Sequence, residues 1–276
     1  MASTVGEQKK SDGATPGIGA RREPLLRVSD LTVRFGGIVA LEDVSFDVVP
    51  GQIAGVIGPN GAGKTTLFNC LSRLYPFQGG SIFFGGRSLL EIPRHGIAAC
   101  GIGRTFQNLA LFRTMNVLQN IMVGAHSWTH GGFLANALRL PIAAREEARV
   151  SSQARDLLEL LDLGAVAYRR VADLPFGTQK RVELGRALAS RPKLLLLDEP
   201  AGGLNHEEVE ALAVLIRRIR DQLGATVLLV EHHMGLVMQL SDKVVALNFG
   251  KKIAEGLPSE VQRNPDVIRA YLGKGS

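Results

Sequence analysis

The residues from Gly58 to Thr65 place three glycines, a lysine and a threonine in the spacing G-x-x-x-x-G-K-[ST]. Glycine allows backbone angles that a Cβ would forbid, so consecutive N–H groups can turn inward and surround a phosphate. The ammonium group of Lys64 can then reach the β- and γ-phosphates, and the hydroxyl of Thr65 can ligate Mg²⁺. The pattern therefore predicts a phosphate loop that binds a nucleotide.

The segments on either side of this loop suit that interpretation. An apolar run, Q-I-A-G-V-I, begins at Gln52 and predicts a buried strand. After the loop, apolar residues recur on one side of a predicted helix at Leu67, Phe68, Leu71 and Leu74. The start of that helix adds its positive dipole end to the phosphate site. The alternative is a glycine-rich turn with a chance lysine, but strand, loop and helix occur together in the required order.

Two acids follow a second apolar run. Asp198 and Glu199 come directly after K-L-L-L-L, which begins at Lys193 and predicts another buried strand. An acid at such a strand end can hold the magnesium shell, and its neighbour can orient and deprotonate a water that attacks the γ-phosphate. We assign Asp198 to Mg²⁺ and Glu199 to general base. The alternative is an acidic pair that simply faces solvent, which would be preferred if the phosphate loop were absent.

A histidine and a glutamine follow other predicted strands. His232 comes after the run T-V-L-L-V-E, which begins at Thr226, and could hydrogen-bond the γ-phosphate and the attacking water. His233 is its competitor. Gln107 follows a short strand that begins at Gly101, and its amide could approach Mg²⁺ or the water.

The remaining patterns predict an α/β fold. Alternating apolar residues over Leu25–Arg34 and Leu41–Val49 predict two strands of an antiparallel sheet that flanks the phosphate loop. The buried strands at Lys193, Thr226 and Lys243 alternate with helices, so we expect them to be parallel and to gather their carboxyl ends at one ligand-binding edge. Two ranges carry those helices: His206–Leu223 and Met234–Leu240.

The chain between residues 116 and 171 has a different composition. It is dominated by Ala, Leu, Arg and Glu, and it predicts helices over Val117–Ala125 and Ala144–Leu163. We expect a helical insertion in the sheet domain. Upstream, Pro93–Cys100 is expected to be one short helix.

Composition limits the class of protein. The 276 residues are 45% apolar and 21% charged, as in globular proteins. The net charge of +6 would permit a nucleic-acid partner, but the basic residues are scattered, so we expect no such partner and a solvated basic surface, or docking near anionic lipid. Two cysteines are too few for a disulfide framework and fit a reducing cytosol. No apolar run approaches the roughly 18 residues that cross a bilayer.

The ordered motifs resemble those of the ATP-binding cassette ATPases, which drive ABC transporters. The resemblance covers Leu25 to the C-terminus. The matching segments are GPNGAGKTT at Gly58–Thr66, Gln107, LPFGTQKR at Leu174–Arg181, LLLLDEP at Leu194–Pro200, AGGLN at Ala201–Asn205, and His232. The resemblance implies a P-loop NTPase (RecA-like) fold: a mostly parallel sheet core, an N-terminal antiparallel β-subdomain and an inserted α-helical subdomain.

The same resemblance implies a layout and a set of site residues. The expected layout is a disordered tail at 1–24 and one cassette domain at 25–276, in which 25–115 and 172–256 form the β-subdomain and core, 116–171 the helical subdomain and 257–276 a C-terminal helical extension. Expected ATP contacts are Phe35, which would stack on adenine, Gly58, Pro59, Asn60, Gly61, Ala62, Gly63, Lys64, Thr65, Thr66, Gly177 and Thr178. Expected catalytic residues are Glu199, His232, Gln107 and Lys64, and expected Mg²⁺ ligands are Thr65, Gln107 and Asp198.

The family's signature segment, usually L-S-G-G-Q, is Leu174-Pro175-Phe176-Gly177-Thr178 in this chain. In the family this segment closes over the ATP bound to the phosphate loop of a second subunit, in a head-to-tail dimer. Pro175 replaces the serine whose hydroxyl normally contacts the γ-phosphate, so we expect a weaker contact. Gly177 remains, and the helix that it opens can still direct N–H groups across the interface.

Within the family, two segments resemble the ATPase subunits of branched-chain amino acid importers: RTFQNLALFRTMNVLQNIMVGAH at Arg104–His126 and NPDVIRAYLG at Asn264–Gly273. Importers of urea, short amides and other polar solutes share these features. The resemblance implies a second ATPase subunit (identical or a paralogue), transmembrane permease subunits, indirectly a solute-binding protein, and a peripheral position on the cytoplasmic face of the inner (plasma) membrane. The segment Asn108–Asn116, with Leu109 and Phe112, would contact the membrane subunits.

A cassette ATPase of translation or DNA maintenance, not coupled to a membrane, is the alternative that the positive charge suggests. Such proteins usually carry two cassettes or a long coiled coil, whereas this chain has one cassette and no heptad pattern.

Overall fold

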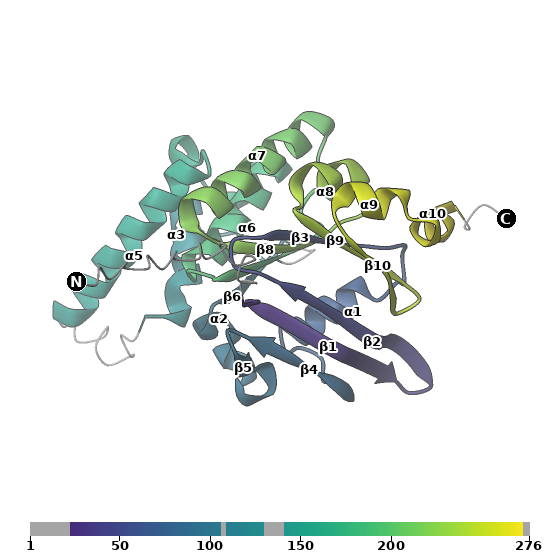
Figure 1. Cartoon of the computed structure of the whole chain (residues 1–276). Helices are drawn as coiled ribbons and strands as arrows, with labels where there is room; N and C mark the ends of the chain where they lie inside the picture. The colour runs from purple at the N-terminus through teal and green to yellow at the C-terminus, as the bar shows by residue number, and fades with distance from the viewer. Residues whose placement is uncertain (1–22, 106–108, 130–140, 273–276) are drawn as a thin grey trace, which may run out of the picture.

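The computed structural model describes residues 23–105, 109–129 and 141–272. Two sheets are present, and the first helix, α1 (Lys64–Leu71), lies between them (Figure 1). Side chains of α1 share one hydrophobic cluster with strands of both sheets. The helix that follows the phosphate loop is therefore part of the core.

The smaller sheet has four antiparallel strands in the order β2-β1-β4-β5. Its strands are β1 (Leu26–Phe35), β2 (Ile38–Val48), β4 (Gly79–Phe84) and β5 (Arg87–Ser88). The simple alternation expected for β1 shifts by one residue at Asp30, which has a φ of +50° and begins a register irregularity. β2 starts three residues earlier than the expected Leu41, because Phe35 pairs with Ile38 across a turn at Gly36 and Gly37.

The larger sheet has six strands in the order β10-β9-β3-β8-β7-β6. Its strands are β3 (Ile53–Ile57), β6 (Ile102–Arg104), β7 (Leu194–Asp198), β8 (Thr226–Val230), β9 (Lys243–Asn248) and β10 (Lys251–Gly256). All neighbours are parallel except β10, which is antiparallel to β9 and was not expected from the sequence. The mostly parallel α/β core predicted above is thus confirmed.

Residues of β7 face two separate hydrophobic clusters. Leu195 and Leu197 pack with the cluster that contains α7 (His206–Leu223) and α8 (Met234–Leu240). The alternate residues Leu194 and Leu196 pack with α1 and the antiparallel sheet. This strand is apolar at successive positions because helices cover one face and a second sheet covers the other.

The helix α1 is anchored by its buried side. Phe68 is fully buried, and so is the thiol-bearing residue Cys70. Burial raises the pKa of the Cys70 thiol to about 12, since the thiolate would lose its hydration in the core. Cys70 is a free cysteine, as is the half-buried Cys100.

Two helices lie in the range expected for the helical insertion, α3 (Val117–Val123) and α5 (Pro141–Leu160), and α6 (Phe176–Ala189) follows that range. α3 begins at a capping box formed by Asn116 and Gln119, and its last turn tightens into a 3₁₀ helix at Gly124–Ser127. The helix expected over Ala144–Leu163 ends earlier, at Leu160, because Asp162 takes a left-handed φ of +54°.

One further segment differs from expectation. Pro93–Cys100 is divided into a 3₁₀ helix at Arg94–Gly96 and the short α2 (Ile97–Cys100), because Gly96 bonds back to the Pro93 carbonyl three residues earlier. The C-terminal extension contains two helices, α9 (Pro258–Arg263) and α10 (Pro265–Leu272). The remaining 3₁₀ helices are Leu89–Glu91, Gly164–Val166 and Val171–Asp173.

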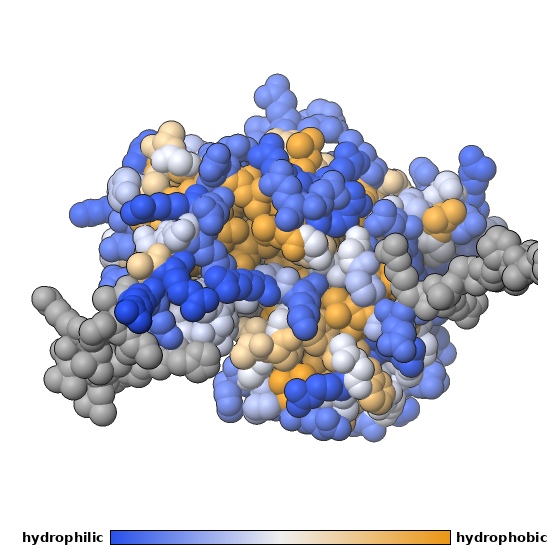
Figure 2. Space-filling model, turned by 60° about the vertical axis from the view of Figure 1, so that its left-hand side comes forward, coloured by the Kyte–Doolittle hydropathy of each residue, from blue (hydrophilic) through white to orange (hydrophobic). Residues whose placement is uncertain are grey.

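The surface carries exposed apolar residues among polar ones. Figure 2 shows apolar residues gathered in the middle of one face, with hydrophilic side chains around them. Among the helices that the structure describes, none is both long and apolar enough to cross a membrane.

The packing of α7 generates a matched pair of stability predictions. Ile216→Ala should lower the free energy of unfolding by about 2–5 kcal/mol, because Ile216 is fully buried and the loss of its side-chain atoms leaves a cavity in the core. Val214→Ala, two residues away on the 53% exposed side, should change it by less than about 0.5 kcal/mol. Urea unfolding measures both, and equal effects would contradict the assignment of the buried face.

Candidate active site

The phosphate loop joins β3 to α1 through backbone that only glycine can supply at two positions. A Cβ on Gly58 would lie 2.3 Å from the carbonyl oxygen of Leu247. Gly63 has a φ of +100°, and its Cβ would lie 2.7 Å from the carbonyl oxygen of Ala40. The loop is therefore closely wrapped by β9 and β2, and its tight backbone fits a cradle for phosphate oxygens.

Lys64 is held against the inside of this loop. Its side chain is 6% exposed, and Nζ donates to the carbonyl oxygens of Gly58 at 2.6 Å and Pro59 at 3.0 Å. Thr65 is exposed and Thr66 is half-buried in the first turn of α1. The ammonium group and the Thr65 hydroxyl thus lie on the loop and at the start of its helix, where an anion would be stabilised.

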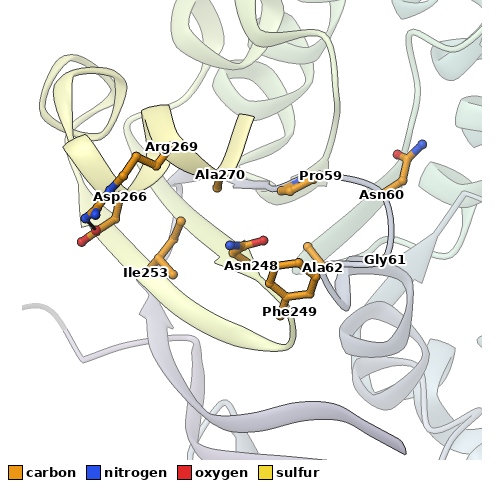
Figure 3. Close-up of a pocket in the computed structure, with 10 residues that line it drawn as sticks. All are labelled: Pro59, Asn60, Gly61, Ala62, Asn248, Phe249, Ile253, Asp266, Arg269 and Ala270. Carbon is orange, nitrogen blue, oxygen red and sulfur yellow. Dashed lines mark hydrogen bonds and ion pairs between the residues drawn. The ribbon is translucent and has the colours of Figure 1, made fainter. Parts of the chain in front are cut away.

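A pocket of about 410 Å³ lies on the outer side of the loop. Figure 3 shows the loop residues Pro59, Asn60, Gly61 and Ala62 on one side of it, with Phe249 of the β9–β10 turn next to Ala62, and Asp266 and Arg269 of α10 on the other side. Tyr271, also on α10, lies against the backbone of Gly58; burial raises the pKa of its hydroxyl, and this backbone group opposes the shift. The C-terminal helix α10 therefore contacts the backbone of the phosphate loop through Tyr271.

Asp198, at the end of β7, forms a buried ion pair that the sequence analysis did not anticipate. Its Oδ2 lies 2.8 Å from Nη2 of Arg104, and the two side chains are 4% and 9% exposed. Nη1 of the same arginine donates to the carbonyl oxygen of Phe68, to Oδ1 of Asn69 and to Oγ of Ser72, all in or just after α1. The guanidinium group of Arg104 thus joins β6, β7 and α1.

Glu199 follows Asp198 with an unusual backbone. Its φ is +47°, a left-handed conformation that is costly for a residue with a Cβ. Its N–H donates to the carbonyl oxygen of Val230 at 2.9 Å. Its own carbonyl oxygen accepts from the N–H of Gly202 at 3.1 Å and from Nζ of Lys180 at 3.3 Å. Hydrogen bonds on both sides therefore fix the segment that presents this carboxylate.

Glu231 is completely buried at the end of β8. Its Oε1 accepts from the N–H of Ala201 at 2.7 Å, and its Oε2 accepts from the N–H groups of His232 at 3.0 Å and His233 at 3.1 Å. Such charge-assisted hydrogen bonds compensate the carboxylate for burial. This acid joins the segment after Glu199 to the histidine segment.

The two histidines that follow β8 differ in what their side chains contact. Nδ1 of His233 accepts from the N–H of Leu236 at 3.3 Å and so caps the N-terminus of α8. The side chain of His232 is 58% exposed. Both histidines are exposed, but the ring of His233 is engaged at the helix cap, so the role of His232 at the γ-phosphate stays a prediction.

Strand order brings these groups to one edge. The phosphate loop follows β3, Glu231 and His232 follow the adjacent β8, and Asp198 ends the next strand, β7. Gln107 lies outside the described residues. The carboxyl ends of neighbouring parallel strands are where α/β proteins bind ligands.

Phe35 and the signature segment lie outside this edge. The ring of Phe35 is 44% exposed and meets the ring of Tyr75 edge to face, with centroids 5.3 Å apart. α6 starts at Phe176, one residue before the expected Gly177, and Thr178 follows in its first turn. Pro175 precedes the helix without a side-chain cap.

The sequence analysis missed Arg104, Lys180 and Glu231 as site residues. Glu231 carries a signal that could have been used, because it follows a buried apolar strand just as Asp198 does. Arg104 and Lys180 have no local signal, since their partners lie far away in sequence.

Comparison with known proteins identifies the family. A family model described as ABC transporter matches residues 41–202, and a model described as branched-chain amino acid ATP-binding cassette transporter matches residues 251–276. The chain belongs to the ABC transporter family. It is an ATP-binding and ATP-hydrolysing cassette of that family, as the resemblance predicted.

Curated relatives extend over almost the whole chain. The chain is 44% identical over 251 residues to the high-affinity branched-chain amino acid transport ATP-binding protein BraF of Pseudomonas aeruginosa, covering 91% of this chain and 98% of the relative. It is 42% identical over 252 residues to the corresponding protein LivG of Escherichia coli K12, covering 91% and 99%.

Solved structures share the fold. A nucleotide-free ATP-binding cassette from an ABC transporter superposes with a TM-score of 0.78 at 28% identity, over 90% of this chain and 98% of that one. The ADP conformation of MJ1267, an ATP-binding cassette of an ABC transporter, superposes with a TM-score of 0.79 at 29% identity, over 91% and 99%. The P-loop NTPase fold with its antiparallel and helical parts is confirmed.

The buried ion pair of this cassette generates a second prediction. Arg104→Met should lower the free energy of unfolding by about 3–5 kcal/mol, because Asp198 would stay buried without its cationic partner. Arg218→Met is the matched control, since its ion pair with Asp162 is 35% and 64% exposed and should contribute at most about 1 kcal/mol. Urea unfolding compares the two variants, and an Arg104→Met loss no larger than that of the control would contradict the prediction.

Proposed function

We propose that this chain is the ATP-hydrolysing subunit of an importer for branched-chain amino acids or a related small polar solute. The identity to BraF over nearly the full length of both chains carries this proposal. The match over residues 251–276 to a model named for branched-chain amino acid transporters supports it independently of the ATPase core. Relatives named as transport proteins do not favour the alternative in translation or DNA maintenance.

We assign the nucleotide to the phosphate loop. Backbone N–H groups from Gly58 to Thr66 would surround the β- and γ-phosphates, with Lys64 exchanging its loop carbonyls for phosphate oxygens. Phe35, whose ring is partly exposed, would stack on adenine. Thr65, Asp198 and Gln107 would hold Mg²⁺, which when bound neutralises charge on the phosphate oxygens.

Hydrolysis is assigned to the residues at the ends of β7 and β8. Glu199 would orient a water against the γ-phosphate and accept its proton, while His232 would hydrogen-bond that water and the phosphate. The hydrogen bonds that fix the backbone of Glu199 support this role, because a general base must be held at a set distance from its water.

A second ATPase subunit, identical or a paralogue, would complete the site. In this arrangement the signature segment of one subunit, with Gly177 and Thr178, closes over the nucleotide on the phosphate loop of the other. Pro175 makes that contact weaker than a serine would. The domain layout proposed for residues 25–276 follows the same family plan, with residues 1–22 outside the described part of the chain.

The membrane partners would be permease subunits, served by a solute-binding protein, with the cassette docked on the cytoplasmic face. Phe112 supports this docking, because its side chain is 46% exposed in the segment expected to meet the permease. The basic net charge would favour a position near anionic lipid.

The assignment of the base predicts the behaviour of one variant. Glu199→Gln should lower the steady-state rate of ATP hydrolysis about 10²–10⁴-fold, because the amide cannot accept the proton. ATP should still bind, as measured by equilibrium titration of the purified protein. A variant with wild-type turnover would remove Glu199 from this role.

Transport assays test the solute. The cassette should be reconstituted in liposomes with its permease subunits, its ATPase partner and the solute-binding protein. Leucine, isoleucine or valine should stimulate ATP hydrolysis and accumulate inside oriented vesicles, whereas lysine should do neither. Stimulation by urea or a short amide alone would redirect the proposal to a related importer.

A further inference from the structure

The signature end of α6 packs tightly against the segment that follows Glu199 in the same chain. A Cβ on Gly203 would lie 2.9 Å from Cε1 of Phe176, and a Cβ on Gly177 would lie 2.5 Å from Oε1 of Glu208. The two segments therefore approach so closely that neither can shift far without moving the other.

Lys180 lies one turn further along α6 and reaches the hydrolysis segment itself. Its Nζ is 5.5 Å from the centroid of the Phe176 ring and 3.3 Å from the carbonyl oxygen of Glu199. Burial lowers the pKa of Lys180, and the carboxylates of Glu183, Glu231 and Glu199 oppose that shift. A cation among three acids is thus held between α6 and the ends of β7 and β8.

The backbone that Lys180 contacts needs such support. Glu199 has a left-handed φ of +47°, so its conformation depends on contacts that outweigh the cost of that geometry. Its carbonyl accepts from Gly202 as well as from Lys180, and Glu231 holds the next part of the segment through the N–H of Ala201.

We propose that Lys180 is a positioning residue for Glu199. Through its hydrogen bond to the Glu199 carbonyl it holds the base in place, and through α6 it transmits the position of the signature segment to the hydrolysis centre of its own chain. The inference rests on the proposed role of Glu199 and on the proposed dimer. Closure of the signature segment over the partner subunit's nucleotide would then also adjust the base that serves this subunit's own nucleotide.

Removal of the cation is the direct test, in the assembled transporter. Lys180→Met should lower kcat for ATP hydrolysis about tenfold, the loss expected when a charge-assisted hydrogen bond that positions a reacting group is removed. The KM for ATP should stay within about twofold, because the phosphate loop is untouched. Lys180→Arg should recover kcat to within about threefold. The matched control is Lys193→Met, an exposed lysine beside the opposite end of β7, which should change neither constant.

A double variant separates this inference from the function on which it depends. In the Glu199→Gln background, Lys180→Met should cause no further loss of turnover, since there is no base left to position. A full tenfold further loss would overturn the inference while leaving Glu199 as the base, and so would a single Lys180→Met with normal kcat. Wild-type turnover in Glu199→Gln alone would instead overturn the proposed role of Glu199 as the base, on which the inference rests.

A second variant covers the case in which Lys180→Met fails to fold. Phe176→Leu keeps an apolar contact with Gly203 but removes the ring face beneath the ammonium group. It should lower kcat about threefold at unchanged KM, and the effect should disappear in the Glu199→Gln background. A change in KM alone would show that Phe176 acts on nucleotide binding, and it would overturn the inference that α6 connects the signature segment to Glu199.

Discussion

The ion pair between Arg104 and Asp198 joins the end of β7 to β6 and α1 at the candidate nucleotide site. Because both side chains are almost completely buried, removing either charge would leave the other in the core without its counter-charge. The same guanidinium group is bonded to the end of the loop helix, so α1, β6 and β7 are fixed relative to one another. Together with the backbone pairing of β3, β8 and β7, this buried cation therefore fixes Asp198 relative to the helix that follows the phosphate loop.

A second buried charge, the carboxylate of Glu231, lies at the end of the neighbouring strand β8. Its strand, β8, lies between β3, which leads into the phosphate loop, and β7, which ends at Asp198. Both carboxylate oxygens of Glu231 accept hydrogen bonds from backbone N–H groups of neighbouring segments. The segments that follow β7 and β8 are thereby joined to each other. A parallel sheet places the strand ends side by side, and these charged hydrogen bonds set their relative positions.

Much of this could be predicted from local patterns. The phosphate loop, the buried strand before Asp198 and the helix His206–Leu223 each carry a complete local signal, and the helix is bounded by its own cap at Asn205 and by Gly224. The structure departs from the predicted strand register and helix end where a residue takes a left-handed φ, as at Asp30 in β1 and Asp162 after α5. Arg104 meets Asp198 across 94 positions of sequence, and such contacts leave no mark on the spacing of nearby residues.

The buried thiol of Cys70 has a practical consequence for following the motions of this cassette. The residue lies on the inner side of the helix that carries the phosphate loop, and its raised pKa keeps the reactive thiolate scarce while that helix stays in the core. An alkylating reagent can modify it only when α1 separates from the sheets. The chain thus contains an intrinsic chemical reporter of local opening beneath its nucleotide site.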